Sequence, residues 1–205
     1  MNTLRWPSLL VALLALLVIP SIVSAQCSRS AEVGRGPDTV QAFGYTIIDG
    51  LHEPIRTGNS FTMDCDAQLG SVQVYVKRAT SDNRGVPPLV GGEMLRCQIY
   101  DMNENFIMET TTPFIGSSLV TFLFWDREFK LAAGTYQFLI STVDHFWGFL
   151  YVGEEYDGGT VMEDYLGFWL PKPAFDLNFS VYWNPDATFV ENESQRFGTI
   201  KATYE

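Results

Sequence analysis

Apolar and polar residues alternate along most of the chain, with the period of two that is typical of a β-strand. The clearest runs are SVQVYV, LRCQIYD, GTYQFLIST and DLNFSVYW. The residues expected to point into a core are Val72, Val74, Val76, Leu95, Cys97, Ile99, Tyr136, Phe138, Ile140, Leu177, Phe179, Val181 and Trp183. Their polar neighbours, Asp176, Asn178 and Ser180 in the last run, are expected to face solvent.

Short turn-forming clusters separate these runs, among them SDNRGVPP, DMNEN, AAG, YDGG and PKP. Beyond the N-terminus there is no long run with the 3.6-residue period of an amphipathic helix. Many short strands with such punctuation predict an all-β fold in which two antiparallel sheets pack face to face as a β-sandwich.

The N-terminal residues have the features of a targeting segment. Arg5 precedes an apolar run over residues 9–19, and Val23 and Ala25 occupy the positions that signal peptidase requires before a cut at Gln26. Residues 1–25 are therefore expected to be a cleaved signal peptide, and the mature protein is expected to be secreted, extracellular or at the cell surface. Removal of 25 residues from 205 leaves 180, enough for one domain with a substantial core.

We expect two parts in the mature chain. Residues 26–58 are rich in glycine and charge and contain one strand-like piece, AFGYTII. Residues 59–205 are expected to form the β-sandwich domain, with RFGTIKATYE as a last strand.

The charge balance narrows the choice of partners. The chain has 13 basic and 24 acidic residues, so loss of Arg5 leaves 12 against 24 and a net charge of −12. Such an acidic surface repels phosphate backbones and anionic lipid heads, so neither nucleic acid nor membrane is an expected partner.

The three cysteines, Cys27, Cys65 and Cys97, all follow the signal segment and would meet an oxidising environment. An odd number allows one internal disulfide and leaves one thiol. Because Cys65 and Cys97 both point to apolar faces in the alternation, they are the expected pair. A bridge from Cys27 to either of them stays open, since sequence does not fix connectivity.

The order of several segments resembles a jelly-roll β-sandwich module of secreted and surface proteins of bacteria and phages. The segments are GNSFTMDCDAQLGSVQVYV, LRCQIYD, LAAGTYQFLIS, YDGG and FDLNFSVYW, and the resemblance covers residues 59–183. It implies a non-catalytic module similar to carbohydrate-binding or adhesion domains. It brings no shared ligand and no functional residues to this chain.

The stretch DHFWGFLYVGEEYDGGT, residues 144–160, concentrates aromatic, acidic and glycine residues. Its alternation predicts mainly the interior of a sheet, followed by a turn. The alternative is a sugar site, in which an exposed ring stacks on a pyranose and carboxylates or amides bind the hydroxyls. The candidate residues for such a site are Trp125, Trp147, Tyr156, Trp169 and Asp157.

Metal binding has weaker support. Calcium needs several oxygen ligands from loops, and the weak candidates are Asp64, Asp66, Glu154 and Asp157. A zinc site is not expected, because His52 and His145 lie far apart in the sequence. No cofactor is expected.

Catalytic motifs are missing: the sequence has no G-x-S-x-G elbow, no P-loop and no H-E-x-x-H. The leading hypothesis is therefore a non-enzymatic binding or surface-interaction module whose partner is a glycan or an extracellular surface protein, carbohydrate being the preferred ligand. The alternative is a structural subunit of an extracellular layer, filament or appendage that self-associates through sheet edges.

Two sequons add one more possibility. Asn178 in NFS and Asn192 in NES match the acceptor pattern for N-glycosylation. The strand pattern predicts that Asn178 faces outward.

Overall fold

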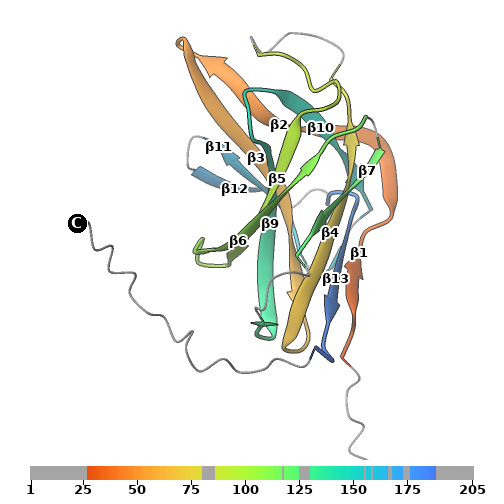
Figure 1. Ribbon diagram of the computed structural model, residues 1–205. Helices are drawn as coiled ribbons and strands as arrows, with labels where there is room; N and C mark the ends of the chain where they lie inside the picture. Colours follow the sequence, from red (N-terminus) through yellow and green to blue (C-terminus); the bar gives the residue numbers. More distant parts are fainter. Residues whose placement is uncertain are drawn as a thin grey trace, which may run out of the picture.

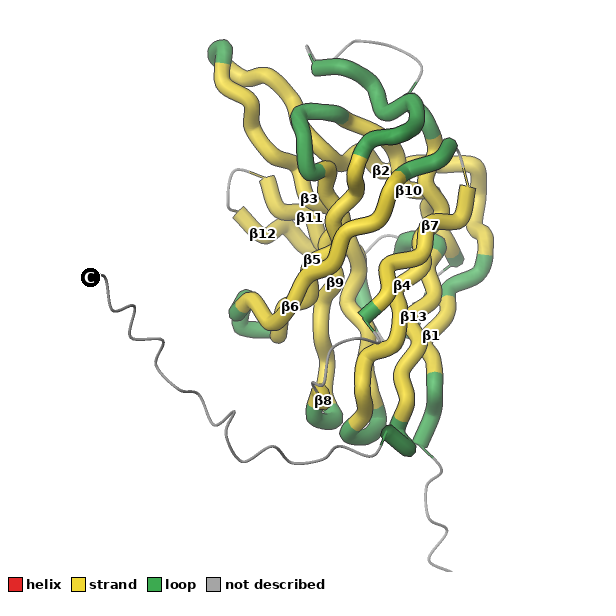
Figure 2. The backbone as a smooth tube through the Cα atoms, viewed as in Figure 1, coloured by secondary structure: helices red, strands yellow, loops and turns green. Residues whose placement is uncertain are grey.

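The computed structural model describes residues 27–79, 86–116, 118–124, 130–154, 156–157, 159–165, 168–172 and 176–187. These residues form strands, turns and loops, and they contain no helix (Figure 2). Accordingly, the described part of the chain has no helix that is long and apolar enough to cross a membrane. The expected signal peptide, Trp125, Asn192 and the terminal segment RFGTIKATYE lie outside the described residues.

The described residues contain thirteen strands, and Figure 1 shows how most of them are arranged. They are β1 (Ser30–Glu32), β2 (Arg35–Ile48), β3 (Leu51–Met63), β4 (Ala67–Lys77), β5 (Met94–Asp101), β6 (Phe106–Pro113), β7 (Ser118–Leu123), β8 (Lys130–Leu131), β9 (Gly134–Thr142), β10 (Trp147–Gly153), β11 (Val161–Tyr165), β12 (Phe168–Lys172) and β13 (Phe179–Asn184). Every pair of these strands is antiparallel, so the expectation of an all-β antiparallel fold is confirmed.

The strands form two groups joined by a short contact. In the first group β4 pairs with β13 along one edge and with β7 and β8 along the other, and β1 extends the group beyond β13. In the second group the order is β10, β2, β3, β9, β5, β6, and β11 with β12 adds to β3. Two residue pairs between β10 and β4 connect the groups. Figure 1 shows β1, β4, β7 and β13 on one side of the molecule, and β3, β5, β6 and β9 on the other.

The main core contains residues of both groups and draws on the alternation read from the sequence. It includes Val72, Val74 and Val76 from β4, which are fully buried. The other residues expected inside are also buried, namely Leu95, Cys97, Ile99, Phe138, Ile140, Leu177, Phe179, Val181 and Trp183. Tyr136 is half-buried and packs at the edge of the core. A pleated strand buries every second side chain, which explains why these predictions held.

The N-terminal segment is part of the same network of strands. The strand-like piece AFGYTII forms the second half of β2, which begins earlier, at Arg35. β3 runs from Leu51 to Met63 and therefore passes through residue 58, where the sequence suggested a division. Its first half pairs with β2 and its second half with β9.

Within the stretch 144–160, the alternating part forms a strand with buried side chains, as predicted. It supplies β10, in which Trp147, Leu150 and Val152 are buried and Phe149 and Tyr151 are partly exposed. The turn that follows carries Tyr156 and Asp157.

The prediction for the polar side of DLNFSVYW is wrong at two positions. Asp176 is 4% exposed and Asn178 is 7% exposed. Both precede the first residue of β13, where the turn after β10 packs over the chain: Asp176 accepts hydrogen bonds there, and the Asn178 N–H donates to the Tyr151 carbonyl at 2.9 Å. Since Asn178 is buried, it does not offer an accessible glycosylation site in the folded protein.

Candidate functional site

The sequence-predicted ring residues do not come together. Trp147 belongs to a small cluster with Ala79 and Val86, whereas Tyr156 packs against the main core. Trp169 belongs to a third cluster, which lies on the opposite surface of the second strand group. A single site containing Trp147, Tyr156 and Trp169 is therefore not what the fold provides.

Trp147 was expected to be exposed at a strand end, and this expectation is wrong. Its side chain is 1% exposed. The segment before β5 covers it: the Leu89 N–H donates to the Trp147 carbonyl at 2.7 Å, and the Trp147 N–H donates to the Pro87 carbonyl at 3.2 Å. Its ring packs edge-on against Phe149 at a centroid distance of 5.0 Å. Trp147 is a structural residue.

The turn with Tyr156 and Asp157 is held in place by a buried polar network. The Asp176 carboxylate accepts from the Asn59 side-chain amide and from the Tyr156 N–H, both at 2.8 Å. The side-chain oxygen Oδ1 of Asn59 accepts from the Leu177 N–H at 3.0 Å. The Tyr156 ring packs edge-on against the core, so its main role is anchoring, while Asp157 is exposed.

Trp169 alone lies on a surface suited to binding. We call this surface the outer face: it consists of the side chains of β3, β5, β6, β9, β11 and β12 that point away from the main core. Its members are Arg56, Arg96, Gln98, Tyr100, Glu109, Leu139, Met162, Asp164 and Trp169. The strand registers bring them together: Asp164 is paired with Arg56 on β3 and with Trp169 on β12.

Charged and polar groups cross the outer face in one connected row. Arg56 forms an ion pair with Asp164, whose side chain is 3% exposed. The other guanidinium nitrogen, Nη1, donates to Tyr100 Oη at 2.7 Å and to Gln98 Oε1 at 3.2 Å. Gln98 Nε2 in turn donates to Glu109 Oε2 at 3.0 Å. The row links β11, β3, β5 and β6, and its members fix one another's orientation.

Aromatic rings lie beside this row. Tyr100 packs edge-on against Trp169 at 5.1 Å and against Phe106 at 5.8 Å between ring centroids. The Arg56 guanidinium carbon lies 5.7 Å from the Tyr100 centroid. Burial raises the pKa of Tyr100 and the Arg56 charge partly offsets this, so the phenol stays protonated at neutral pH. Phe106 is 54% exposed, whereas Trp169 is partly buried against the cluster of Tyr100, Leu139 and Met162.

Gly58 shows how closely the strands approach beneath this surface. A Cβ atom at this position would lie 1.6 Å from the Phe138 carbonyl oxygen. The position between Met162 and Leu139 therefore holds no side chain. Leu139 and Met162, both buried, form an apolar floor with Tyr100 and Trp169.

Two of the four calcium candidates accept hydrogen bonds from the protein, and the other two are exposed. Asp64 accepts from the Ser28 N–H at 2.9 Å and from the Ser28 hydroxyl at 2.9 Å, and the backbone bond lowers the pKa of Asp64. Asp66 accepts from the Ala133 N–H at 2.8 Å. Glu154 and Asp157 are exposed and are not grouped with a third ligating side chain within the described residues.

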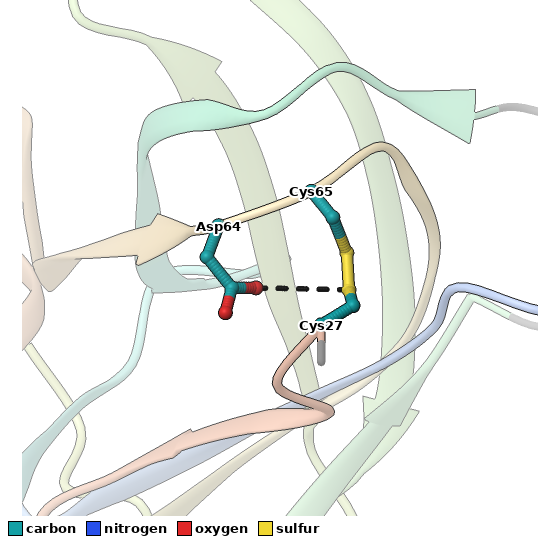
Figure 3. Close-up of side chains that lie close together, drawn as sticks. All are labelled: Cys27, Asp64 and Cys65. Carbon is teal, nitrogen blue, oxygen red and sulfur yellow. Dashed lines mark hydrogen bonds between the residues drawn. A yellow bond between two sulfur atoms is a disulfide. The ribbon is translucent and has the colours of Figure 1, made fainter. Parts of the chain in front are cut away.

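One compact group of potential ligands exists in the described part of the chain: Cys27, Asp64 and Cys65 (Figure 3). Its ligand atoms lie within 4.8 Å of one another, and Asp64 Oδ1 is 3.6 Å from Cys27 Sγ. Metal binding by cysteine requires thiolates. Because Cys27 and Cys65 are joined in a disulfide, this group offers only one carboxylate to a cation.

The disulfide itself differs from the expected pairing of Cys65 with Cys97. The structure joins Cys65 to Cys27, with a Cα–Cα distance of 5.7 Å. Cys65 lies in the turn after β3, beyond the last inward residue, and faces the start of the described chain. Cys97 lies in the middle of β5 and is a free, fully buried thiol, and desolvation raises the pKa of Cys97.

Most outer-face residues escaped the sequence reading. The alternation of LRCQIYD did put Arg96, Gln98 and Tyr100 on the side opposite Cys97. No local signal, however, connects Arg56 with Asp164, because their proximity comes from the β3–β11 pairing.

Comparison with known proteins adds no assignment: no protein-family model matches the chain, and no curated protein matches it either.

Proposed function

We propose that this chain is a secreted, non-catalytic binding module with a jelly-roll β-sandwich fold, and that its outer face binds carbohydrate. The proposal rests on the row Asp164–Arg56–Gln98–Glu109, which lies beside the exposed ring of Phe106 and the partly buried ring of Trp169. An extracellular surface protein that carries such a glycan would be engaged by the same face.

The chemistry of the face suits a sugar. A pyranose presents an apolar C–H surface that packs on an aromatic ring, and hydroxyl groups that both donate and accept hydrogen bonds. Trp169 and Phe106 supply two rings that both pack against Tyr100, and Gln98 and Glu109 supply an amide and a carboxylate from the neighbouring strands β5 and β6. The row is organised in advance by its own hydrogen bonds, which reduces the ordering cost of binding.

The arrangement favours binding over hydrolysis. Glycoside hydrolysis uses two carboxylates that act on one bond, one as acid and one as base or nucleophile. Asp164 is 3% exposed and is engaged by Arg56, so it has little access to a substrate. This supports the non-enzymatic proposal.

A structural subunit is the second candidate, and one surface favours it. The outward side of β4 and β7 exposes Tyr75, Leu119 and Leu123, by 42%, 42% and 55%. Tyr75 and Leu119 are directly paired across the two strands. A second copy covering this surface would bury apolar area and could extend the assembly.

A glycan microarray probed with the purified mature protein tests the first proposal. Trp169→Ala should abolish binding to any glycan that the wild type retains. Phe168→Ala is the matched control: this neighbouring ring is 69% exposed, but it points to the opposite side of β12, so its removal should leave binding unchanged. Equal binding by the wild type and Trp169→Ala, or no binding to any glycan, would contradict the proposal.

Light scattering after size-exclusion chromatography tests the second candidate. A stable oligomer that dissociates in Leu123→Glu would support a structural subunit that assembles through β7. A monomer at all concentrations would contradict it.

A further inference from the structure

The two histidines of the chain, although distant in sequence, lie together at one end of the molecule. His52 is the second residue of β3, directly after the β2–β3 hairpin, which is the orange loop at the top of Figure 1. His145 lies in the turn between β9 and β10. Both side chains are exposed. This proximity was not predicted, because the separation of the two histidines along the chain argued against a zinc site.

The rings are close enough to share a ligand. The centroids of His52 and His145 are 4.2 Å apart, with an angle of 42° between the ring planes. Tyr45 packs edge-on against His145 at a centroid distance of 4.7 Å. Two imidazole nitrogens bound to one ion at about 2.1 Å lie roughly 3 Å apart. Exposed side chains at this ring separation reach that arrangement by rotation about their own bonds.

The backbone holds both histidines in position. The His52 segment is fixed by its pairing with Ile47 in the β2–β3 ladder. In the β9–β10 turn, the Thr142 hydroxyl donates to the Asp144 carbonyl at 2.6 Å. The Tyr45 N–H donates to the Phe146 carbonyl at 2.9 Å, which ties this turn to β2. The pair is therefore set by the fold and does not depend on one flexible loop.

We propose that His52 and His145 form a binding site for a divalent first-row transition-metal ion, and that copper(II) binds there most tightly. Neutral imidazole is a common ligand for copper, nickel and zinc, and affinity at a given nitrogen site rises along the series to copper(II). The strong negative charge of the protein raises the local concentration of cations. Two protein ligands leave the remaining positions of the ion to water.

This site is separate from the outer face. The outer-face row is built from side chains of β3, β5, β6 and β11 centred on Arg56, whereas the histidines belong to the hairpin end of β3 and the β9–β10 turn. A negative result for metal binding would therefore leave the carbohydrate proposal untouched, and the reverse is also true.

Isothermal titration of the purified mature protein with copper(II) tests the proposal, together with electron paramagnetic resonance of the bound ion. We expect one tight copper ion per chain, with spectral coupling to imidazole nitrogens. His52→Asn and His145→Asn should each weaken binding by about tenfold or more and remove one nitrogen coupling. Because both side chains are exposed, these variants should fold normally, which circular dichroism verifies.

Tyr45→Phe is the matched control. It keeps the ring packed against His145 and should retain the copper affinity of the wild type. Unchanged copper affinity in both histidine variants, or a wild-type protein that binds no copper, would overturn the proposal. Nickel(II) and zinc(II), titrated in the same way, should each bind more weakly than copper(II). Tighter binding of either ion than of copper(II) would exclude a nitrogen-ligand site.

Discussion

The two sides of strands β3, β9 and β5 use the same backbone for opposite purposes. On the inner side, Phe61, Phe138 and Cys97 have no exposed surface and pack in the main core. On the outer side, Arg56 and Gln98 belong to a row of hydrogen bonds that ends at the partly exposed carboxylate of Glu109. Alternate residues of one strand thus either pack in the core or take part in the outer-face row, the surface that we propose binds a glycan.

The two sides should respond differently to substitution. Inner side chains contribute through burial of apolar volume, which tolerates little change in size. Outer side chains contribute through paired polar groups, whose loss leaves an unpaired partner behind. Substitutions on the inner side should therefore change stability, and substitutions on the outer side should change binding. Five variants test this comparison, from the largest expected change in unfolding free energy to the smallest.

The largest effect is expected for Phe138→Ala. Phe138 is fully buried, its ring packs against Phe179 at 5.2 Å, and its removal leaves a cavity in the main core. The free energy of unfolding should fall by about 3–5 kcal/mol. Urea denaturation followed by tryptophan fluorescence measures it. A change below about 1 kcal/mol would show that the inner side is not the principal core.

Removal of the disulfide should come next. Cys27 and Cys65 are 38 residues apart in sequence, and their bond clips the start of the described chain to the end of β3. The double variant Cys27→Ser, Cys65→Ser should lose about 2–4 kcal/mol, because the unfolded chain regains conformational freedom. If mass spectrometry of the non-reduced wild type found Cys65 linked to Cys97, the pairing described here would be wrong.

Asp164→Asn should have an intermediate effect. It removes the carboxylate from a nearly buried ion pair and leaves the Arg56 charge, which is 25% exposed, without its partner. A loss of about 1–3 kcal/mol is expected, below that of a fully buried pair because solvent screens Arg56. Adding Arg56→Met to this variant should restore part of the loss, and strictly additive effects would argue against coupling across the β3–β11 pair.

Two adjacent positions on β5, 97 and 98, should differ in thiol reactivity because they point to opposite sides of the strand. Cys97 faces the core and its thiol pKa is raised by desolvation, so it should not react with a maleimide in the folded protein at neutral pH. Gln98→Cys places a thiol on the outer face and should react readily, while loss of the amide contacts costs about 1 kcal/mol. Labelling followed by intact-mass measurement distinguishes the two, and rapid labelling of Cys97 would contradict the assignment of faces.

The smallest change in stability is expected for Trp169→Ala. The ring is partly buried and packs on the small cluster of Tyr100, Leu139 and Met162 outside the main core, so the loss in unfolding free energy should stay below about 1 kcal/mol. The same substitution should abolish glycan binding. A melting temperature close to that of the wild type, measured by differential scanning fluorimetry, would confirm that binding and stability separate on this face.

The sequence predicted the inner side well because burial in a strand follows a local rule. Val72, Val74 and Val76 could be assigned from six consecutive letters. The failures are non-local. Trp147 is covered by a segment far from it in sequence, and Asp176 is buried because Asn59 and the Tyr156 N–H satisfy its charge.

The candidate sites were harder to predict for the same reason. Trp169 was identified as a ring residue, but its neighbours Arg56 and Tyr100 come from other strands. The histidine pair forms because the β2–β3 hairpin lies beside the β9–β10 turn, and the spacing of residues in the sequence does not predict this contact. Pairing between distant strands decides both sites.

A nuclear magnetic resonance titration of the ¹⁵N-labelled protein with a glycan that it retains on the array locates the binding surface. We expect amide shifts to concentrate on the outer face, at Gln98, Tyr100, Glu109 and Trp169, and to leave the amides of β4 and β13 unchanged. Shifts confined to the exposed surface of β4 and β7 would contradict this expectation.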